Sequence, residues 1–333
     1  MPTRSAPSAA PPRARVLAAF AAVYVLWGST YLAIRVAIQS LPPLLMAGAR
    51  FLLAGGILYA FMRLRGEPAP TRRHWVSTSI VGMLLLMFGN GGVVLAERSV
   101  PSGVVALLVA MVPMWMVLLE WLRPRGNRPT LQTVVGLLIG FAGIMLLVGP
   151  AGIAGGEPVD PLGALLVMTG AAAWAAGSIY SRGAPLPRSA MVATGMEMGW
   201  GGVWLLLAGT VRGEWATVDP SAFTAESLLA FGYLVAFGSL VGFTAYIWLL
   251  GVSTPARVST YAYVNPVVAV VLGWAFLDEP LTPRVMAAAA VIILAVAVIT
   301  TGKRTVPPVA HAEPEERVTA DGERAGEPAR SAA

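Results

Sequence analysis

The chain has 333 residues, of which 56% are hydrophobic and only 12% are charged, and its formal net charge is +6. A soluble domain carries about 25% charged residues, so we expect most of this chain to face lipid or packed protein. The absence of Cys excludes disulfides and thiol chemistry, and two His residues alone predict neither a zinc site nor another metal or cofactor site.

Ten apolar stretches follow one another, each long enough to form a helix across a hydrocarbon core of about 30 Å. They cover residues 16–38, 43–63, 76–96, 101–122, 131–149, 161–181, 188–211, 227–250, 256–277 and 283–301. Prolines mark several of the starts, where the missing N–H costs little. Residues 1–15 and 302–333 are polar and rich in Pro and Ala, which predicts two disordered cytoplasmic tails.

The basic residues alternate between the two sides of these spans. With the N-terminus in the cytoplasm, most Lys and Arg residues fall in the inner segments, whereas the outer loops hold only Arg98, Arg212 and Arg284. By the positive-inside rule, this predicts an even number of spans and two cytoplasmic termini. The basic residues lie in short loops, which indicates membrane topology and no nucleic-acid partner.

An internal repeat relates the two halves of the chain. Gly28-Ser29-Thr30-Tyr31 returns as Gly177-Ser178-Ile179-Tyr180, and Pro113 has its counterpart in Pro266. Each half holds five spans, so the second half must cross the membrane in the opposite orientation. We therefore predict an all-α integral membrane protein of ten transmembrane helices, built as two inverted five-helix repeats. The repeats cover residues 16–149 and 161–301, and a periplasmic linker covers residues 150–160.

Several motifs occur in a family-specific order, from Trp27-Gly28-Ser29-Thr30-Tyr31 through Gly89-Asn90 and Pro101-Ser102-Gly103 to Tyr263-Val264-Asn265-Pro266. In this order they resemble the EamA branch of the drug/metabolite transporter superfamily, and its drug/metabolite exporter subgroup in particular. The resemblance covers about residues 16–301. It implies a carrier of the bacterial inner membrane in which helices 1–4 and 6–9 surround a cavity and helices 5 and 10 pack outside. It also implies export of small metabolites or drugs, amino-acid-like or amphipathic, with proton exchange.

Arg50 and Glu197 are the most deeply placed ionisable residues of the predicted spans. An intramembrane charge costs at least about 2.5–3.5 kcal/mol, so both side chains should face protein or water. In one interpretation Arg50 holds an anionic group of a substrate and Glu197 exchanges a proton. In the other, the two residues form a structural ion pair across the bundle.

Aromatic and amide side chains are the other candidates for a substrate cavity. Trp27, Trp115, Trp174 and Tyr263 could form an aromatic cavity for amphipathic or cationic metabolites, or could serve only as packing. Tyr31 and Tyr180 are candidates for the cavity wall. Asn90 and Asn265 could bind substrate or satisfy backbone carbonyl groups, and for Asn265 we favour the second.

Small residues and prolines within the spans suggest contacts and kinks. Gly28 and Gly177 predict close helix packing, with spans 1 and 6 approaching each other across the repeat axis. Pro113 and Pro266 each remove a backbone hydrogen bond, and the freed carbonyls must be satisfied inside the protein. Both kinks should therefore face the bundle interior, as hinges or as static bends.

Transport by alternating access is the leading prediction, with a small-molecule substrate and the lipid bilayer as the partners. An intramembrane enzyme would need a nucleophile with a base, or a carboxylate cluster at one depth. No His lies in a span and Glu197 is the one deep carboxylate, so we do not expect an enzyme. A channel or facilitator without ion coupling remains the other alternative, although the charged rings expected of many pores are absent.

Overall fold

The computed structural model describes residues 12–123, 129–148, 159–253, 258 and 260–301. Most of the two predicted tails and of the linker at 150–160 therefore lies outside the described residues. Within the described ranges every regular element is a helix, and no strand occurs.

The first repeat consists of five helical spans. In chain order they are α1 (Arg13–Ala37); α2 (Pro43–Leu64); α3 (Arg72–Gly82) continuing through η1 (Met83–Asn90) into α4 (Gly91–Ala96); α5 (Ser102–Val109) followed by α6 (Val112–Leu122); and α7 (Leu131–Val148). Prolines begin or precede several of these helices, as predicted, because the first N–H groups of a helix have no intrahelical partner.

The second repeat repeats this order. Its spans are α8 (Pro161–Ser181); α9 (Ala190–Val211); α10 (Ala225–Tyr233) continuing through η5 (Leu234–Val241) into α11 (Gly242–Val252); α13 (Tyr261–Leu277); and α14 (Pro283–Thr301). Two short 3₁₀ turns, η3 (Glu214–Thr217) and η4 (Pro220–Ala222), follow α9. Seven of the runs in the two repeats are long and apolar enough to cross a membrane by length and composition, and shorter apolar helices accompany them. The all-α, ten-span prediction is confirmed.

The two spans that contain the repeated prolines behave differently. The fourth span is interrupted between α5 and α6, and Pro113 lies in the first turn of α6. Pro266 lies inside α13, which continues past it. Pro113 thus begins a new helix segment, whereas Pro266 leaves its helix continuous.

A feature that the sequence analysis missed is a wide π-helical turn in the third span and another in the eighth. The π segments η1 and η5 are eight residues long each and begin 151 positions apart, at Met83 and Leu234. They therefore occupy equivalent places in the two repeats. Such π turns are rare and often lie at functional sites.

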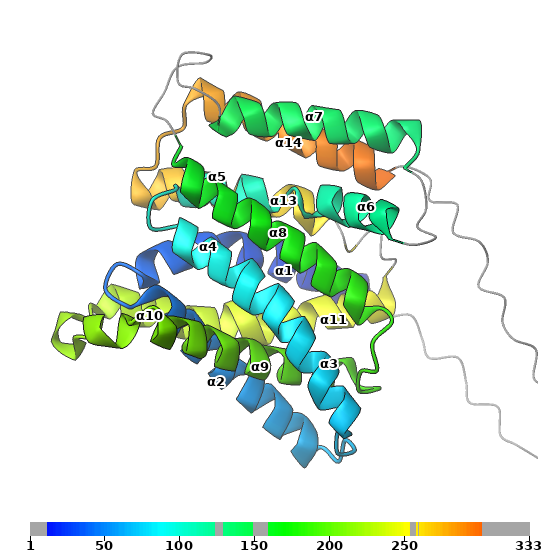
Figure 1. Ribbon diagram of the computed structural model, residues 1–333, viewed down its shortest axis with the longest axis vertical. Helices are drawn as coiled ribbons and strands as arrows, with labels where there is room; N and C mark the ends of the chain where they lie inside the picture. The colour runs from blue at the N-terminus through cyan, green and yellow to red at the C-terminus, as the bar shows by residue number, and fades with distance from the viewer. Residues whose placement is uncertain (1–11, 124–128, 149–158, 254–257, 259, 302–333) are drawn as a thin grey trace, which may run out of the picture. The chain divides into compact units, whose positions relative to one another are not determined.

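Helices of the two repeats interleave. Three helix pairs join equivalent or symmetry-related spans, namely α2 with α9, α7 with α14, and α5 with α13. Figure 1 shows α7 and α14 paired at the top of the view. The helix α1 packs on α13 and on the α10–η5–α11 span of the other repeat, and α8 packs in the same way on the α3–η1–α4 span and on α5 and α6.

This interleaving defines two groups of three spans, each with members from both repeats. We call α1, α10–η5–α11 and α13 the first triad, and α8, α3–η1–α4 and α5–α6 the second triad. Spans 1 and 6 were predicted to pack against each other, and this is wrong. Instead, α1 packs within the first triad and α8 within the second. Each nevertheless contacts the opposite repeat.

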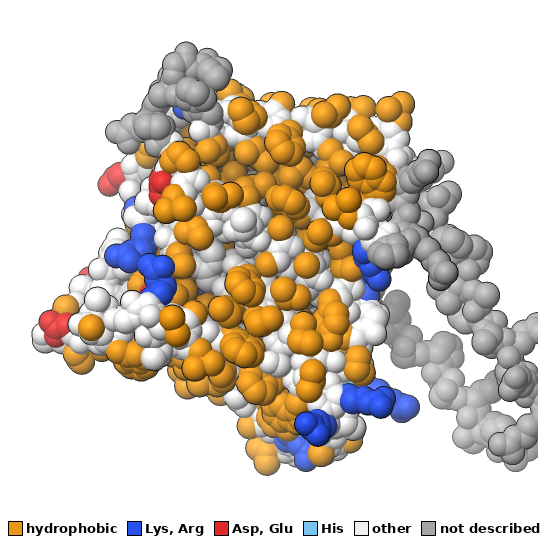
Figure 2. Space-filling model, in the orientation of Figure 1, with side chains coloured by type: hydrophobic (Ala, Val, Ile, Leu, Met, Phe, Trp, Pro, Cys, Tyr) orange, Lys and Arg blue, Asp and Glu red, His pale blue; other side chains and the backbone are white. Residues whose placement is uncertain are grey.

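The surface of the helical bundle is largely apolar. Large side chains such as Leu138, Phe141 and Leu165 are more than half exposed to the surroundings of the protein. Figure 2 shows hydrophobic side chains across the middle of one face, with charged side chains gathered toward its left and right ends. This distribution fits helices whose middles face lipid and whose ends reach water.

Candidate substrate cavity

A cavity of about 230 Å³ lies between the two triads. The first triad contributes residues such as Trp27 and Asn265, and the second contributes residues such as Asn90 and Trp174. Arg50 and Phe51 of α2 complete the wall. Both prolines, Pro113 and Pro266, also line the cavity, so they face the bundle interior.

Arg50 lies in the wall and is 3% exposed. Its Nε donates to Ser239 Oγ at 3.0 Å, and its guanidinium carbon lies 4.6 Å from the centre of the Phe51 ring. Its Nη1 has no hydrogen-bond partner among the described residues. Gly238 leaves room for the guanidinium, because a Cβ at that position would lie 3.2 Å from Nη2.

Glu197 lies elsewhere, on α9, and does not line the cavity. Its backbone carbonyl faces Gly82, where an added Cβ would approach it to 2.5 Å. The ion pairs found in the described part of the chain do not include one between Arg50 and Glu197. The structure thus separates two residues that the sequence places at similar depth.

The aromatic candidates divide into lining and packing residues. Trp27, Tyr31 and Trp174 line the cavity. Trp115 packs against the main hydrophobic core, and Tyr180 is 37% exposed; neither is among the lining residues. The side chain of Tyr263 lies outside the described part of the structure.

Besides Phe51, two aromatic residues that were not predicted from the sequence also line the cavity, Phe243 and Tyr261. Their rings pack against Trp27 with centroid distances of 5.2 Å each, and Trp27 Nε1 donates to the carbonyl of Gly238 at 3.3 Å. Tyr261 lies in the first turn of α13, and the hydropathy of the span does not indicate which of its residues face a cavity.

The two amides have different surroundings. Asn90 ends η1, and its buried Oδ1 has no hydrogen-bond partner among the described residues. With its amide nitrogen turned toward two backbone carbonyls, Asn265 donates to Tyr24 O at 3.3 Å and to Tyr261 O at 3.2 Å. Asn90 therefore has an acceptor to offer to a solute, whereas Asn265 bonds the protein backbone.

Gly28 and Gly177 both mark close helix contacts. A Cβ on Gly28 would lie 2.6 Å from Val268 Cβ of α13, and a Cβ on Gly177 would meet the side chains of Leu84 and Leu85 in η1. Each glycine thus lies at the contact of its helix with another span of the same triad.

Carboxylates hold two helix N-termini at one end of the bundle. Glu214 accepts hydrogen bonds from the backbone N–H groups of Leu44 and Leu45 in α2, at 2.9 and 3.0 Å. Glu279, which follows α13, accepts from Ser102 and Gly103 of α5 at 2.6 and 3.1 Å. Negative charge at a helix N-terminus is favourable, and the second contact joins the first triad to the second.

The same end carries a further capping carboxylate. Asp160 caps α8 by accepting from Leu162 and Gly163, and it also accepts from Ser99 Oγ at 2.5 Å. The hydrogen bond from Ser99 is the main reason that the pKa of the Asp160 carboxyl lies below its ordinary value.

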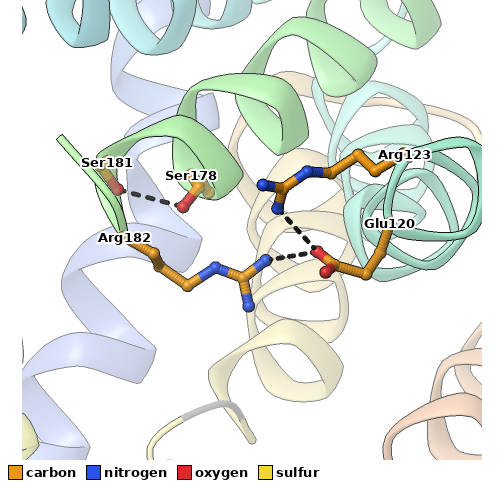
Figure 3. A network of polar contacts seen from close by, with 5 residues as sticks. All are labelled: Glu120, Arg123, Ser178, Ser181 and Arg182. Atoms are coloured by element: carbon orange, nitrogen blue, oxygen red, sulfur yellow. Dashed lines mark hydrogen bonds and ion pairs between the residues drawn. The ribbon is translucent and has the colours of Figure 1, made fainter. Parts of the chain in front are cut away.

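At the opposite end, an ion-pair cluster ties two helices of the second triad together. Figure 3 shows Glu120 of α6 between Arg123 and Arg182. Its Oε2 lies 2.9 Å from Arg182 Nη2, at the end of α8, and 3.6 Å from Arg123 Nη1. These side chains are partly exposed, so the pairs contribute little stability but link α6 to α8.

Comparisons with known proteins agree with this architecture. The EamA-like transporter family matches residues 14–149 and again residues 161–301. The chain is 41% identical over 287 residues to "Uncharacterized inner membrane transporter YedA" of Escherichia coli (strain K12). The aligned region covers 86% of this chain and 90% of the relative.

More distant relatives align over a similar length. "Uncharacterized transporter YvbV" of Bacillus subtilis (strain 168) is 26% identical over 299 residues, covering 87% of this chain and 93% of the relative. A solved structure described as "Crystal structure of protein" superposes with a TM-score of 0.57 at 21% identity, covering 86% of this chain and 96% of that one. This last likeness supports the fold alone.

Proposed function

The chain belongs to the EamA-like transporter family and is a multi-pass transporter of the inner membrane, and we propose that it is a secondary active transporter of small metabolites or drugs. The observation that carries the proposal is the cavity between the two triads, which receives residues from both repeats. A site at the interface of inverted repeats suits a transporter, because movement of one group against the other can expose it to either side.

The triads, rather than the sequence halves, are the proposed moving units. Each triad packs internally through contacts such as that of Gly28 with α13, and the cavity lies between the two triads, which also meet where α5 packs on α13. At the end where α5 begins, Glu279 links the triads, and Glu97, Val100 and Ser102 are fully buried. We propose that this is the periplasmic end and that it is closed, so that the cavity is reached from the cytoplasm.

Export is the proposed direction, following the family resemblance. The test is the extracellular metabolite profile of cells that produce the wild-type protein or Ala171→Trp, which places a large side chain in the cavity wall. We expect at least one compound to accumulate outside with the wild type and not with the variant. Equal accumulation, with both proteins intact by size-exclusion chromatography, would argue against transport through this cavity.

Glu197 is the proposed proton-exchanging residue, because it is a carboxylate in the middle of a described span, away from the ion pairs at the helix ends. In proteoliposomes, Glu197→Gln should abolish the dependence of solute flux on a pH gradient while leaving downhill counterflow. Its position outside the cavity favours a second candidate, a facilitator without ion coupling. If solute flux through the wild-type protein does not depend on the pH gradient, the protein is a facilitator.

The proposed topology places both termini in the cytoplasm and residue 155 in the periplasm, because the basic residues concentrate in the loops on the side of the N-terminus. Reporter fusions check this directly. A phosphatase that is active only in the periplasm should be inactive at either terminus and active when inserted at residue 155. Activity at the C-terminus would require an odd number of spans and would refute the inverted repeat.

A further inference from the structure

The cavity wall contains a buried positive charge that forms no ion pair with a described residue. Of the described residues that line it, Arg50 is the only one with a charged side chain. No described carboxylate lies within ion-pair distance of its guanidinium, and Nη1 has no hydrogen-bond partner. Burying a charge is costly unless a counter-charge and hydrogen bonds accompany it.

No described acidic side chain forms an ion pair with Arg50. Glu97 interacts electrostatically with Arg50, but neither oxygen of Glu97 accepts a hydrogen bond from a described residue. Glu97 is 0% exposed and does not line the cavity. Glu214 and Glu279 are each engaged with two backbone N–H groups. Among the described residues, no carboxylate therefore lines the cavity or forms an ion pair with Arg50.

The guanidinium is nevertheless held in a defined position. Ser239 fixes Nε, the Phe51 ring lies against the guanidinium plane, and Gly238 leaves the space beside Nη2 free. A guanidinium fixed in this way can present its N–H groups to a planar anion in a two-point contact. The absence of a side chain at Gly238 matters here, because a Cβ would press on Nη2.

The rest of the cavity suits an apolar body of small size. Trp27, Tyr31, Trp174 and Phe243 present aromatic surface, and no described lining residue is acidic. A cationic solute would meet the charge of Arg50 without a carboxylate to hold it, so the aromatic wall serves apolar contact rather than cation binding. The volume of about 230 Å³ is smaller than the roughly 300–1,000 Å³ of pockets for drug-sized ligands.

Asn90 adds one polar contact to the cavity wall. Its buried Oδ1 has no partner among the described residues, so it can accept a hydrogen bond from a hydroxyl, amine or amide group of the solute. Arg50 comes from α2 and Asn90 from the second triad, so a solute that touches both would contact two different elements of the wall.

From these observations we infer that the transported solute is a small organic monoanion, whose negatively charged group binds Arg50 and whose apolar body lies against the aromatic wall. The inference rests on the proposed transport function and specifies its substrate class. It also excludes organic cations as the main substrates of this cavity.

Matched pairs of probes test the inference on the purified full-length protein. The pairs are 3-phenylpropionate, indole-3-acetate and 4-methylvalerate with their neutral primary amides, and phenethylamine serves as the cation. We expect at least one carboxylate to raise the melting temperature of the wild type, and its amide and phenethylamine to have no effect. Loss of a partner from a buried charged contact weakens binding roughly 30-fold or more, so Arg50→Met should abolish the carboxylate response.

Two further variants separate recognition from folding. Arg50→Lys keeps the charge but loses the two-point contact, so it should retain a weaker response. Arg212→Met makes the same change as Arg50→Met at an exposed residue after α9, and should respond like the wild type. The inference is overturned if amides bind as well as carboxylates, if Arg50→Met keeps the response, or if no carboxylate produces a shift.

Flux measurements keep this inference distinct from the transport proposal. A carboxylate that binds should also exchange across proteoliposomes that contain the wild type. Flux of an amide or of phenethylamine, without flux of carboxylates, would support the proposed transport function and overturn the inference that the substrate is a monoanion. Binding of a carboxylate without any flux would support the inferred anion site and count against the proposed transport function.

Discussion

Gly55 and Gly56 are neighbours on α2 with opposite surroundings. A Cβ on Gly55 would lie 2.4 Å from Gly199 N and 2.6 Å from Gly195 O on α9, whereas Gly56 has nothing within 4 Å. Backbone atoms cannot yield as a flexible side chain can, so Gly55→Ala should lower the free energy of unfolding by about 1–3 kcal/mol.

Gly56→Ala is the matched control for this substitution. Alanine has the higher helix propensity, so the variant should be as stable as the wild type or slightly more stable. Unfolding in mixed micelles followed by tryptophan fluorescence compares the variants. Equal stability of the two variants would mean that α2 and α9 are further apart than the structure places them.

The sequence predicts which residues lie deep in the membrane better than it predicts which way they face. Arg50 and Glu197 occupy similar depths in equivalent spans, yet Arg50 lines the cavity and Glu197 does not. Two positions along a helix turn a side chain by about 200°, so a small difference in register decides whether a residue such as Tyr261 faces the cavity. The depth of a residue in the membrane follows from hydropathy, whereas the direction of its side chain depends on how the helices pack.

Among the elements, the contact between Glu279 and the N-terminus of α5 joins the two triads at the end of the cavity that we propose is closed. Glu279→Ala removes this contact, so the closed end should open more often. The chain contains no Cys, which makes a single introduced thiol a clean reporter. We expect Ala106→Cys, in the cavity wall, to react faster with a membrane-impermeant thiol reagent added outside when it is combined with Glu279→Ala.

Glu214→Ala provides the comparison for that prediction. Glu214 caps α2 in the same manner, but α2 belongs to neither triad. Loss of a charged hydrogen bond of this kind costs about 1.5–3 kcal/mol, so this variant should be less stable without faster labelling of the introduced thiol. Faster labelling in both variants would reflect general loosening and would contradict a specific role of Glu279.

The π segment η1 predicts an unusual tolerance of deletion. A π turn holds more residues than an α turn, so removal of Phe88 can let η1 close into a regular α-helix without rotating the flanking segments. Removal of Leu53, which has a similarly exposed side chain, instead turns the rest of α2 by about 100° against α9. We expect the Phe88 deletion to give a folded protein by size-exclusion chromatography and the Leu53 deletion to aggregate. Aggregation of both would show that η1 is required for folding.

Helix bounds were predictable to within a few residues because prolines and charged loops mark them. The predicted span 43–63 is observed as Pro43–Leu64, and 131–149 as Leu131–Val148. The π segments were not predictable, since their residues are as apolar and as helix-compatible as those around them. Hydropathy reports that a residue lies in the membrane but does not report how many residues fill a turn.

In the whole molecule, the interleaved packing implies that neither repeat folds alone. The helix α1 finds its partners in the second repeat and α8 finds its partners in the first. We therefore expect a fragment of residues 1–158 to be degraded when produced by itself, and to become stable when residues 159–333 are co-produced. Immunoblotting of membranes measures this, and a stable isolated first fragment would contradict the interleaved arrangement.

The family and the ten-span architecture were both predictable at this scale, because they depend on the order of motifs and on hydropathy. The resemblance to the EamA branch is confirmed by the match over residues 14–149 and 161–301. The exchange of helices between repeats was not predictable, since Gly28 and Gly177 indicate close packing but not the partner.

The equivalent positions of η1 and η5 also bear on the history of the gene. Two independent insertions would not be expected to fall at the same place in both repeats, 151 residues apart. One insertion in a single ancestral five-helix protein, copied when its gene duplicated, accounts for both. That ancestor would have assembled from two identical chains in opposite orientations, so the wide turn is older than the fusion that now joins them.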